Sequence, residues 1–364
     1  MTLISYHSRI HFACDVLEDA LHAEIDAGGY RSVLIVCDAA DGDGETARRV
    51  AAGVPSRVRT TTALIGPGAA PAVTARMTMA DDPEAWDCIV AFGSQRAVVH
   101  AWACRRAQAD ASYERLPACD RRTGRAGPRR AEFIAVPGID GLPGAVWSGA
   151  GGGTATGGAD PSPPSVVICD PTLILDADEA ARASAWANAL GRCLEALGHA
   201  AFNPPADGMA VEGLRRLMLT GPDGGDDALV RARDLMAAGL NGAMAQQKGQ
   251  GLTQAIGDAL SEGSGRDVDA GAVKRILLPR MMADRVIALD AHDAVIRRIF
   301  DFDDLRALGE AMAGLLDRLP LAHRFRGLDV AETALDFVAD RLEACHEIVV
   351  PPRDRLSAML RELY

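Results

Sequence analysis

A strand-to-helix turn in the first half of the chain has the residues needed to bind a phosphate group. The apolar run 88–92 turns through Gly93 and Ser94 into a stretch with helical spacing. Main-chain N–H groups at such a turn can hold a pyrophosphate, because glycine has no Cβ and permits close approach. An earlier apolar run, 32–37, ends in Asp38. We therefore take Asp38, Gly93 and Ser94 as candidate cofactor-binding residues.

The eight cysteines, by contrast, offer no recognisable site. None of them forms a Cys-x-x-Cys pair, and their spacing fits neither a zinc site nor a disulfide framework. We expect most of them to be reduced and buried as small apolar side chains.

Composition and charge exclude several classes of partner. The 364 residues include 50 acidic and 38 basic side chains, so the formal net charge is −12. This balance argues against a nucleic acid or an anionic membrane surface as a partner. No apolar run approaches the roughly 18 residues of a membrane-spanning helix, and the N-terminus lacks the pattern of a signal peptide. The sequence predicts a cytoplasmic protein.

The pattern of apolar residues divides the chain into two domains. Before Asp170-Pro171, continuous apolar runs alternate with helical stretches, which is typical of a mostly parallel sheet with both faces covered. After it, apolar residues recur at three-and-four spacing almost to the end. We predict an α/β Rossmann-like domain over residues 1–171 and an all-helical domain over residues 172–364. The expected strands are 32–37, 60–65, 88–92, 133–137 and 166–169, and the expected helices of the second domain are 178–200, 211–219, 226–245, 252–262, 270–288, 302–319, 331–345 and 354–363.

Two segments lack both patterns. Residues 109–130 are polar and end in a basic run, and residues 149–164 are rich in glycine, alanine and proline. Both are predicted to be mobile surface loops. The basic run is interpreted as a solvated loop, with contact to an anionic partner as the alternative.

Short segments in order along nearly the whole chain together resemble the superfamily of iron-containing alcohol dehydrogenases and maleylacetate reductases. They are residues 8–12, 89–94, 134–137, 167–171, 188–190, 194–197, 203–204, 277–279 and 351–353. The resemblance implies a dehydroquinate synthase-like fold, with a dinucleotide-binding N-terminal domain and a helical C-terminal domain that holds the metal or the substrate. Ligands of such folds are expected in the cleft between the domains. The likeness also implies a homodimer.

The resemblance implies a metal site whose ligands have been replaced. Metal-dependent members carry an Asp and a His four residues apart on one helix, and the matching positions here are Asn188 and Arg192. Two later histidines match Gln254 and Asp258, and the last one falls on or near Ala270. A guanidinium stays protonated and cannot ligate a cation. We therefore expect no metal.

The resemblance also implies an NAD(P) cofactor, at motifs that have changed. Phe92 stands where the superfamily keeps a glycine, so its ring is expected to crowd the pyrophosphate or to alter the turn. His100 replaces a lysine, and the loop 138–146 lacks the hydroxyl groups and the glutamate of the second signature. Two interpretations stay open: a retained NAD(P) site, or a helix N-terminus that no longer holds a cofactor.

Two roles are open for Arg192 and Asp258. They can form a salt bridge that fills the former metal site. Alternatively, Arg192 binds a substrate carboxylate and Asp258 acts as a general acid or base, while Gln254 and Asn188 orient the ligand. The hypotheses for the whole chain are a metal-independent reductase of a keto acid, a non-redox enzyme acting on a small acidic molecule, and a non-catalytic partner of another enzyme.

Overall fold

The computed structural model describes residues 8–66, 68–81, 85–114, 130–148, 163–222, 225–301, 308–344, 348 and 350–364. Contacts divide them into two units. The α/β unit contains the described residues up to Gly138 together with residues 163–173. The helical unit contains residues 139–148 and the described residues from Ile174 to Tyr364. The chain therefore enters the helical unit twice.

A six-stranded sheet forms the centre of the α/β unit. Its strands are β1 (Arg9–Phe12), β2 (Ser32–Asp38), β3 (Arg59–Ile65), β4 (Cys88–Gly93), β5 (Glu132–Pro137) and β6 (Val166–Cys169). All neighbouring strands pair in parallel, in the order β1-β6-β5-β4-β2-β3. Every residue of β2 is buried, as expected for a strand covered on both faces. The predicted parallel α/β arrangement is confirmed.

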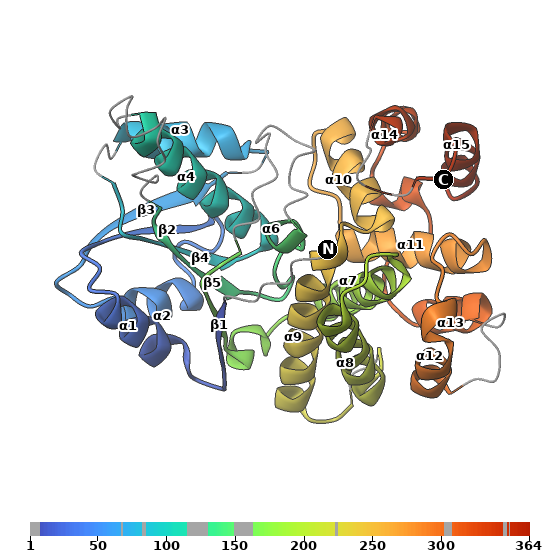
Figure 1. Ribbon diagram of the computed structural model, residues 1–364, viewed down its shortest axis with the longest axis horizontal. Helices are drawn as coiled ribbons and strands as arrows, with labels where there is room; N and C mark the ends of the chain where they lie inside the picture. The colour runs from blue at the N-terminus through green and yellow to red at the C-terminus, as the bar shows by residue number, and fades with distance from the viewer. Residues whose placement is uncertain are drawn as a thin grey trace. The chain divides into compact units, whose positions relative to one another are not determined.

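Helices cover both faces of this sheet (Figure 1). On one face lie α1 (Leu17–Ala27) and α2 (Glu45–Gly53), whose Leu21 and Val50 share a core with Val90 of β4. On the other face lie α3 (Pro71–Asp81) and α4 (Gln95–Glu114). The C-terminal ends of β2 and β4, which carry the predicted cofactor residues, are neighbours in the sheet.

Helix α4 is longer than the sequence predicted. It runs to Glu114, so the prediction of a loop from residue 109 is wrong for its first six residues. Ala109 is buried, and its packing continues the helix beyond the apolar stretch that ends near Trp102. Residues 115–129 and 149–162, which make up nearly all the rest of the two predicted loops, lie outside the described residues.

A buried carboxylate ties α1 and α2 to the end of the sheet. Asp170 directly follows β6 and is inaccessible to solvent. Its donors are the main-chain N–H groups of Asp15 (2.9 Å), Leu17 (3.3 Å) and Thr172 (3.1 Å), the Thr172 hydroxyl (2.7 Å) and Arg49 Nη2 (2.8 Å). Burial alone would raise the pKa of Asp170, but these donors outweigh it and lower the pKa.

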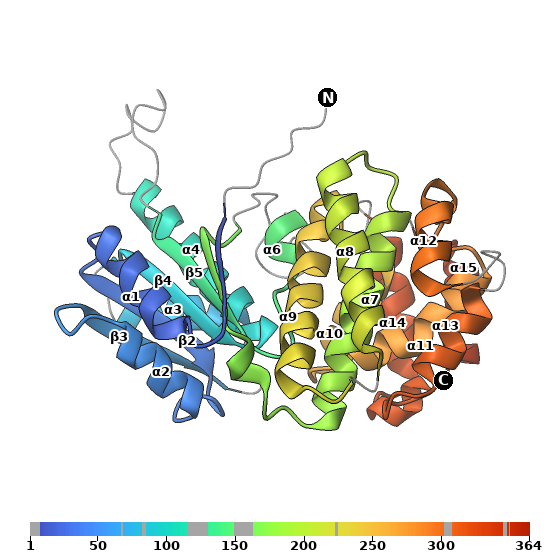
Figure 2. The same ribbon diagram turned by 90° about the horizontal axis from the view of Figure 1, so that it is seen from below.

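The helical unit is built around α7 (Glu179–Gly198). Every residue from Ala185 to Leu197 is buried. α8 (Pro204–Thr220), α9 (Ala228–Ala245) and α11 (Ala270–Ala283) pack against it, and Figure 2 shows α8 and α9 alongside α7. The other helices are α6 (Ala145–Ser148), α10 (Leu252–Ser264), α12 (Asp293–Phe300), α13 (Leu308–Leu316), α14 (Thr333–Glu343) and α15 (Arg353–Glu362), with the 3₁₀ turns η2 (Pro171–Ile174), η3 (Gln246–Lys248), η4 (Asp290–His292) and η6 (Phe325–Leu328). Among the described residues, no helix combines the length and the apolar character needed to cross a membrane.

Helix ends account for most differences from the predicted helices. α8 starts at Pro204, well before residue 211, because Asn203 caps the helix and a proline suits its first position. α11 ends at Ala283 rather than 288, and Arg285 beyond it takes a left-handed conformation with a φ of +53°. α12 was not predicted. Residues 302–307, the start of another predicted helix, lie outside the described residues.

Close packing of α11 on α7 gives a first testable prediction. A Cβ at Gly271 would lie 2.1 Å from the main-chain oxygen of Ser184 on α7. Gly271→Ala should force the helices apart and lower the free energy of unfolding by about 2–3 kcal/mol, as measured by urea denaturation. Gly257→Ala on α10 is the matched control, because its Cβ would meet nothing closer than 3.8 Å. That alanine should be neutral or stabilise by up to about 1 kcal/mol; equal losses in both variants would contradict the prediction.

Candidate functional site

The turn after β4 brings the three predicted cofactor-binding residues together. Gly93 has a φ of +94°, a conformation that favours glycine. Ser94 Oγ donates to the Asp38 carboxylate at the end of β2 and accepts from the Ala97 N–H at 3.3 Å. Arg96, which the sequence analysis did not single out, donates to Asp38 Oδ1 through Nε at 2.9 Å. A hydroxyl and a guanidinium from the start of α4 thus hold the Asp38 carboxylate.

Phe92 lies away from the turn, in the core. Alternate residues of a strand face opposite sides of the sheet, and Phe92 shares its side with Cys88 and Val90. Its ring is only 2% exposed and packs in the core formed with α1 and α2. The expectation that this ring crowds a bound phosphate is therefore wrong. His100 is also buried, and its Nδ1 pairs with Thr74 Oγ1 of α3 at 2.8 Å.

Several residues at this edge of the sheet fit a dinucleotide, although the Asp41 carboxylate lies next to Gly93 and would have to move away from a bound pyrophosphate. The turn contains a left-handed glycine, and the N-terminus of the long helix α4 follows at once. A Cβ at Gly138 would lie 3.0 Å from the Gly93 carbonyl oxygen, so a second glycine permits the end of β5 to approach the turn. Asp38 adds a carboxylate at the end of the neighbouring strand.

The segment after β5 belongs to the helical unit. The Leu142 carbonyl accepts a hydrogen bond from Arg192 Nη1 at 2.5 Å. Gln246 of η3 packs over Gly144, where a Cβ would lie 1.5 Å from Gln246 Oε1. Leu142 and Trp147 are buried. This segment therefore completes the packing around α7 and η3.

The helical unit contains a cluster of polar and charged side chains. Its solvent-accessible side is formed by Gln250, Gln254 and Asp258, which lie on or just before α10. Gln250 Nε2 donates to Asp258 Oδ2 at 2.7 Å, and Gln254 Nε2 donates to Oδ1 at 2.8 Å. Both oxygens of Asp258 therefore have partners other than Arg192. Solvent reaches Asp258, but the dense protein around its carboxylate raises its pKa, against the opposing effect of the two glutamines.

Arg192 and Asn188 are buried one turn apart on α7. Burial lowers the pKa of Arg192 to about 10, although the Asp258 carboxylate acts in the opposite direction. The structure thus brings Arg192, Asp258 and Gln254 into one electrostatic cluster. Asn188 is linked to it by its place on the same face of α7, and its Oδ1 accepts no hydrogen bond within the described residues.

Lys274 is a member of this cluster that the sequence analysis missed. Its side chain is wholly buried, and its Nζ donates to Gln254 Oε1 at 3.1 Å. Burial lowers the pKa of Lys274 to about 8, although the carboxylates of Glu195 and Asp258 oppose this effect. The sequence contains one indication of its role. Lys274 follows Ala270 by four residues, which places both on one face of a helix.

Glu195 is the second charged residue that was missed. It accepts hydrogen bonds from the Thr253 N–H at 2.6 Å and from the Thr253 hydroxyl at 2.8 Å. Burial raises the pKa of Glu195, and the nearby Lys274 ammonium opposes the rise. Its sequence neighbours are apolar, so only its place inside a buried helix reveals that the carboxylate must have partners.

The cysteines among the described residues form no disulfides. Five of these six thiols are buried and Cys14 is exposed, which confirms the prediction for this part of the chain. Cys119 and Cys345 lie outside the described residues.

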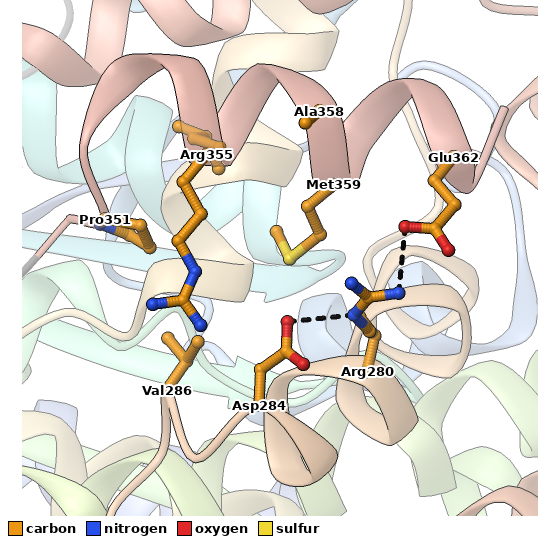
Figure 3. Close-up of a pocket in the computed structure, with 9 residues that line it drawn as sticks. Arg280, Asp284, Val286, Pro351, Arg355, Ala358, Met359 and Glu362 are labelled. Carbon is orange, nitrogen blue, oxygen red and sulfur yellow. Dashed lines mark hydrogen bonds and ion pairs between the residues drawn. The ribbon is translucent and has the colours of Figure 1, made fainter.

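A small pocket on the helical unit contains none of the cluster residues. It lies between the end of α11 and α15 and has a volume of about 100 Å³ (Figure 3). Its Arg280 donates to Asp284 and to Glu362, both at 2.8 Å. Since this guanidinium is already paired twice, we assign the pocket no ligand.

Comparison with known proteins shows which of them resemble this chain in sequence and in fold. No family model matches the chain. Over 217 residues it is 30% identical to a 4-hydroxybutyrate dehydrogenase from Cupriavidus necator, a match that covers 55% of this chain and 55% of that protein. The chain thus matches about half the length of this curated relative.

Solved structures show similarity over the whole chain. Maleylacetate reductase from Agrobacterium tumefaciens has a TM-score of 0.69 at 21% identity and covers 100% of this chain and 97% of its own. Sulfoacetaldehyde reductase from Bifidobacterium kashiwanohense, in complex with NAD⁺, has a TM-score of 0.74 at 18% identity and covers 100% and 99%. The chain has the fold of the iron-containing alcohol dehydrogenases and maleylacetate reductases. The predicted superfamily fold is confirmed.

The residues at the positions that match the metal site of iron-containing alcohol dehydrogenases do not fit a divalent ion. Arg192 and Lys274 place two cationic side chains in the cluster, and Ala270, at the start of α11, has no ligand atom. Within the described part of the chain, no group of three or more His, Cys, Asp or Glu side chains is arranged to hold a metal ion. Like charge would repel a cation brought to this position.

Proposed function

We propose that the chain is a nicotinamide-dependent oxidoreductase that interconverts the carbonyl and alcohol forms of a short carboxylic acid without a metal ion. One observation carries the proposal: Arg192 and Lys274 are buried beside the solvent-accessible Asp258. An anionic ligand at Asp258 would interact favourably with both cations, which Asp258 and Glu195 now compensate. The name of the sequence relative, 4-hydroxybutyrate dehydrogenase, refers to a substrate of this class and supports the proposal.

In this proposal, side chains of the helical unit bind the substrate, orient it and donate a proton to it. Asp258 is proposed to be the acid that donates a proton to a carbonyl oxygen during reduction, and the upward shift of its pKa is in the direction that suits this role. Arg192 and Lys274 stabilise the negative charge of the substrate carboxylate and of the oxygen on which charge develops. Gln254 orients the Asp258 carboxyl by its hydrogen bond. Asn188 offers Oδ1 as an acceptor for a substrate hydroxyl.

The α/β unit is proposed to hold the cofactor. The main chain at Gly93 and the N-terminus of α4 would bind the pyrophosphate of NAD(P), and Asp38 would accept hydrogen bonds from a ribose. When bound, the nicotinamide supplies or accepts the hydride. Ser94 and Arg96 keep the Asp38 carboxylate in place for the ribose.

Titration with NADH and NADPH, followed by nicotinamide fluorescence, tests the redox proposal. We expect saturable binding of at least one of them, and turnover with 4-oxobutanoate that survives dialysis against a chelator. Absence of binding at millimolar cofactor would contradict the proposal and favour the non-redox alternative at the same cluster. Stoichiometric metal whose removal abolishes turnover would overturn metal independence alone.

The Asp38–Arg96 pair gives a prediction for cofactor choice. The carboxylate repels a 2′-phosphate, so the wild-type chain should prefer NADH. Asp38→Ser removes that charge and releases the Arg96 N–H groups that now bond to Asp38. The ratio of NADPH to NADH affinity should rise about 10-fold to 100-fold, because a hydrogen bond to a charged group contributes about 1.5–3 kcal/mol. The double variant Asp38→Ser/Arg96→Ala should lose the gain; a ratio that is the same in all three proteins would contradict the prediction.

A further inference from the structure

Lys274 lies among polar and charged groups contributed by three helices. It belongs to α11, and its Nζ donates to Gln254 Oε1 of α10 at 3.1 Å. The carboxylates of Glu195 on α7, Asp258 on α10 and Asp269 favour the ammonium electrostatically, whereas the Arg192 guanidinium opposes it. A wholly buried lysine is strongly unfavourable without such compensation. The surrounding groups are therefore the reason that the charge can be buried here.

The main chain is also shaped around this side chain. A Cβ at Gly191 of α7 would lie 2.5 Å from Lys274 Cδ, so any larger residue would displace the lysine. A Cβ at Gly251 would lie 2.1 Å from Glu195 Oε2, and Thr253 holds the same carboxylate with two hydrogen bonds. Glycines thus make room for both the ammonium and one of its counter-charges.

We infer that Lys274 is a resident cation that takes the place of the metal ion in this fold. Together with Arg192, the ammonium compensates the negative charges of the Glu195 and Asp258 carboxylates. In the proposed function, Arg192 and Lys274 both act on an anionic substrate. The compensation by Lys274 stands without the proposed function, whereas its consequence for substrate binding rests on that function.

Replacement of the missing ammonium from solution tests the inference. Lys274→Ala removes three methylene groups and the ammonium, which together match n-propylammonium in shape and charge. We expect the variant to lose thermal stability and n-propylammonium chloride to raise its Tm by at least about 2 °C. Sodium chloride and n-propanol at the same concentration are the controls for ionic strength and for apolar filling. A rise that either control reproduces would overturn the inference.

A second, isosteric variant gives a test if Lys274→Ala does not fold. Because the pKa of Lys274 is lowered to about 8 from 10.5, the unfolded chain binds its proton more tightly than the folded chain. The stability of the wild type should therefore rise, relative to that of Lys274→Met, as pH increases from 8 to 10.5. Lys248→Met is the matched control, because Lys248 is also buried but pairs with Asp207 at 2.6 Å. A rise that Lys274→Met retains, or one that begins well below pH 8, would contradict the inference, because Lys274 would then not be a cation at neutral pH.

The two proposals fail in distinguishable ways. If the wild type binds neither NADH nor NADPH, the proposed function fails while both stability measurements remain informative. If cofactor binding and turnover are intact but 4-oxobutanoate KM is unchanged in Lys274→Met, the role of Lys274 toward the substrate is wrong. An increase in this KM of at least about tenfold, absent in Lys248→Met, would support it.

Discussion

Replacing Asp170 with alanine should lower the free energy of unfolding by about 3–5 kcal/mol, the loss typical when one partner of a buried ion pair is removed. The variant leaves the N–H groups of Asp15 and Leu17 without their acceptor at the start of α1. It also removes one of the carboxylates that hold Arg49 of α2. Urea denaturation followed by circular dichroism measures the effect.

An exposed ion pair between α1 and the loop after α2 gives the control for Asp170. Asp26 pairs with Arg57 at 2.6 Å, but the two side chains are 61% and 52% exposed. Asp26→Ala should therefore change the free energy of unfolding by less than about 1 kcal/mol. The Asp170 contribution should persist at every pH above 3.8 and be lost only as pH falls through its lowered pKa. A loss no larger than that of Asp26→Ala would contradict the role given to Asp170.

Asp258→Asn should reduce kcat for the reduction of 4-oxobutanoate by about 10²-fold to 10⁴-fold, the range expected when a general acid is removed. Asparagine keeps the shape of the side chain and can still accept from Gln250 or Gln254, so the fold should persist. Steady-state kinetics at saturating cofactor measure the effect, and NADH affinity should not change because Asp38, Gly93 and Ser94 belong to the other unit.

Another carboxylate on α10 serves as the control for Asp258. Glu262 pairs with Arg341 at 3.3 Å and is exposed. Glu262→Gln should leave kcat within about twofold of wild type, since the pair is screened by solvent. If Asp258→Asn also leaves kcat unchanged, Asp258 does not act as the acid.

The strands and most helices could be predicted because their signals are local. Continuous apolar runs and three-and-four spacing reflect burial of a strand or of one helix face, and both can be counted along the chain. The ends of helices were less predictable. The start of α8 depends on one capping side chain, Asn203, and the extension of α4 depends on contacts of Ala109 that no short pattern reveals.

The candidate site could be predicted only where neighbouring elements have a fixed relation. Asp38, Gly93 and Ser94 come together because parallel strands end at the same edge of a sheet. Phe92 was misjudged because a motif position was considered without the alternation of β4. Lys274 was missed because a charged residue in a helix is usually exposed, and only the packing of three helices shows that it is buried.

The excursion of residues 139–148 into the helical unit affects the order in which the chain can fold. This segment is synthesised before any of the long helices on which it packs. The Leu142 carbonyl can accept its hydrogen bond only after Arg192, 50 residues later, has been synthesised. A fragment beginning at Ile174 would contain every helix from α7 onward but would lack that carbonyl and the indole of Trp147. Separate expression of the helices should therefore require this short segment to be supplied as a peptide.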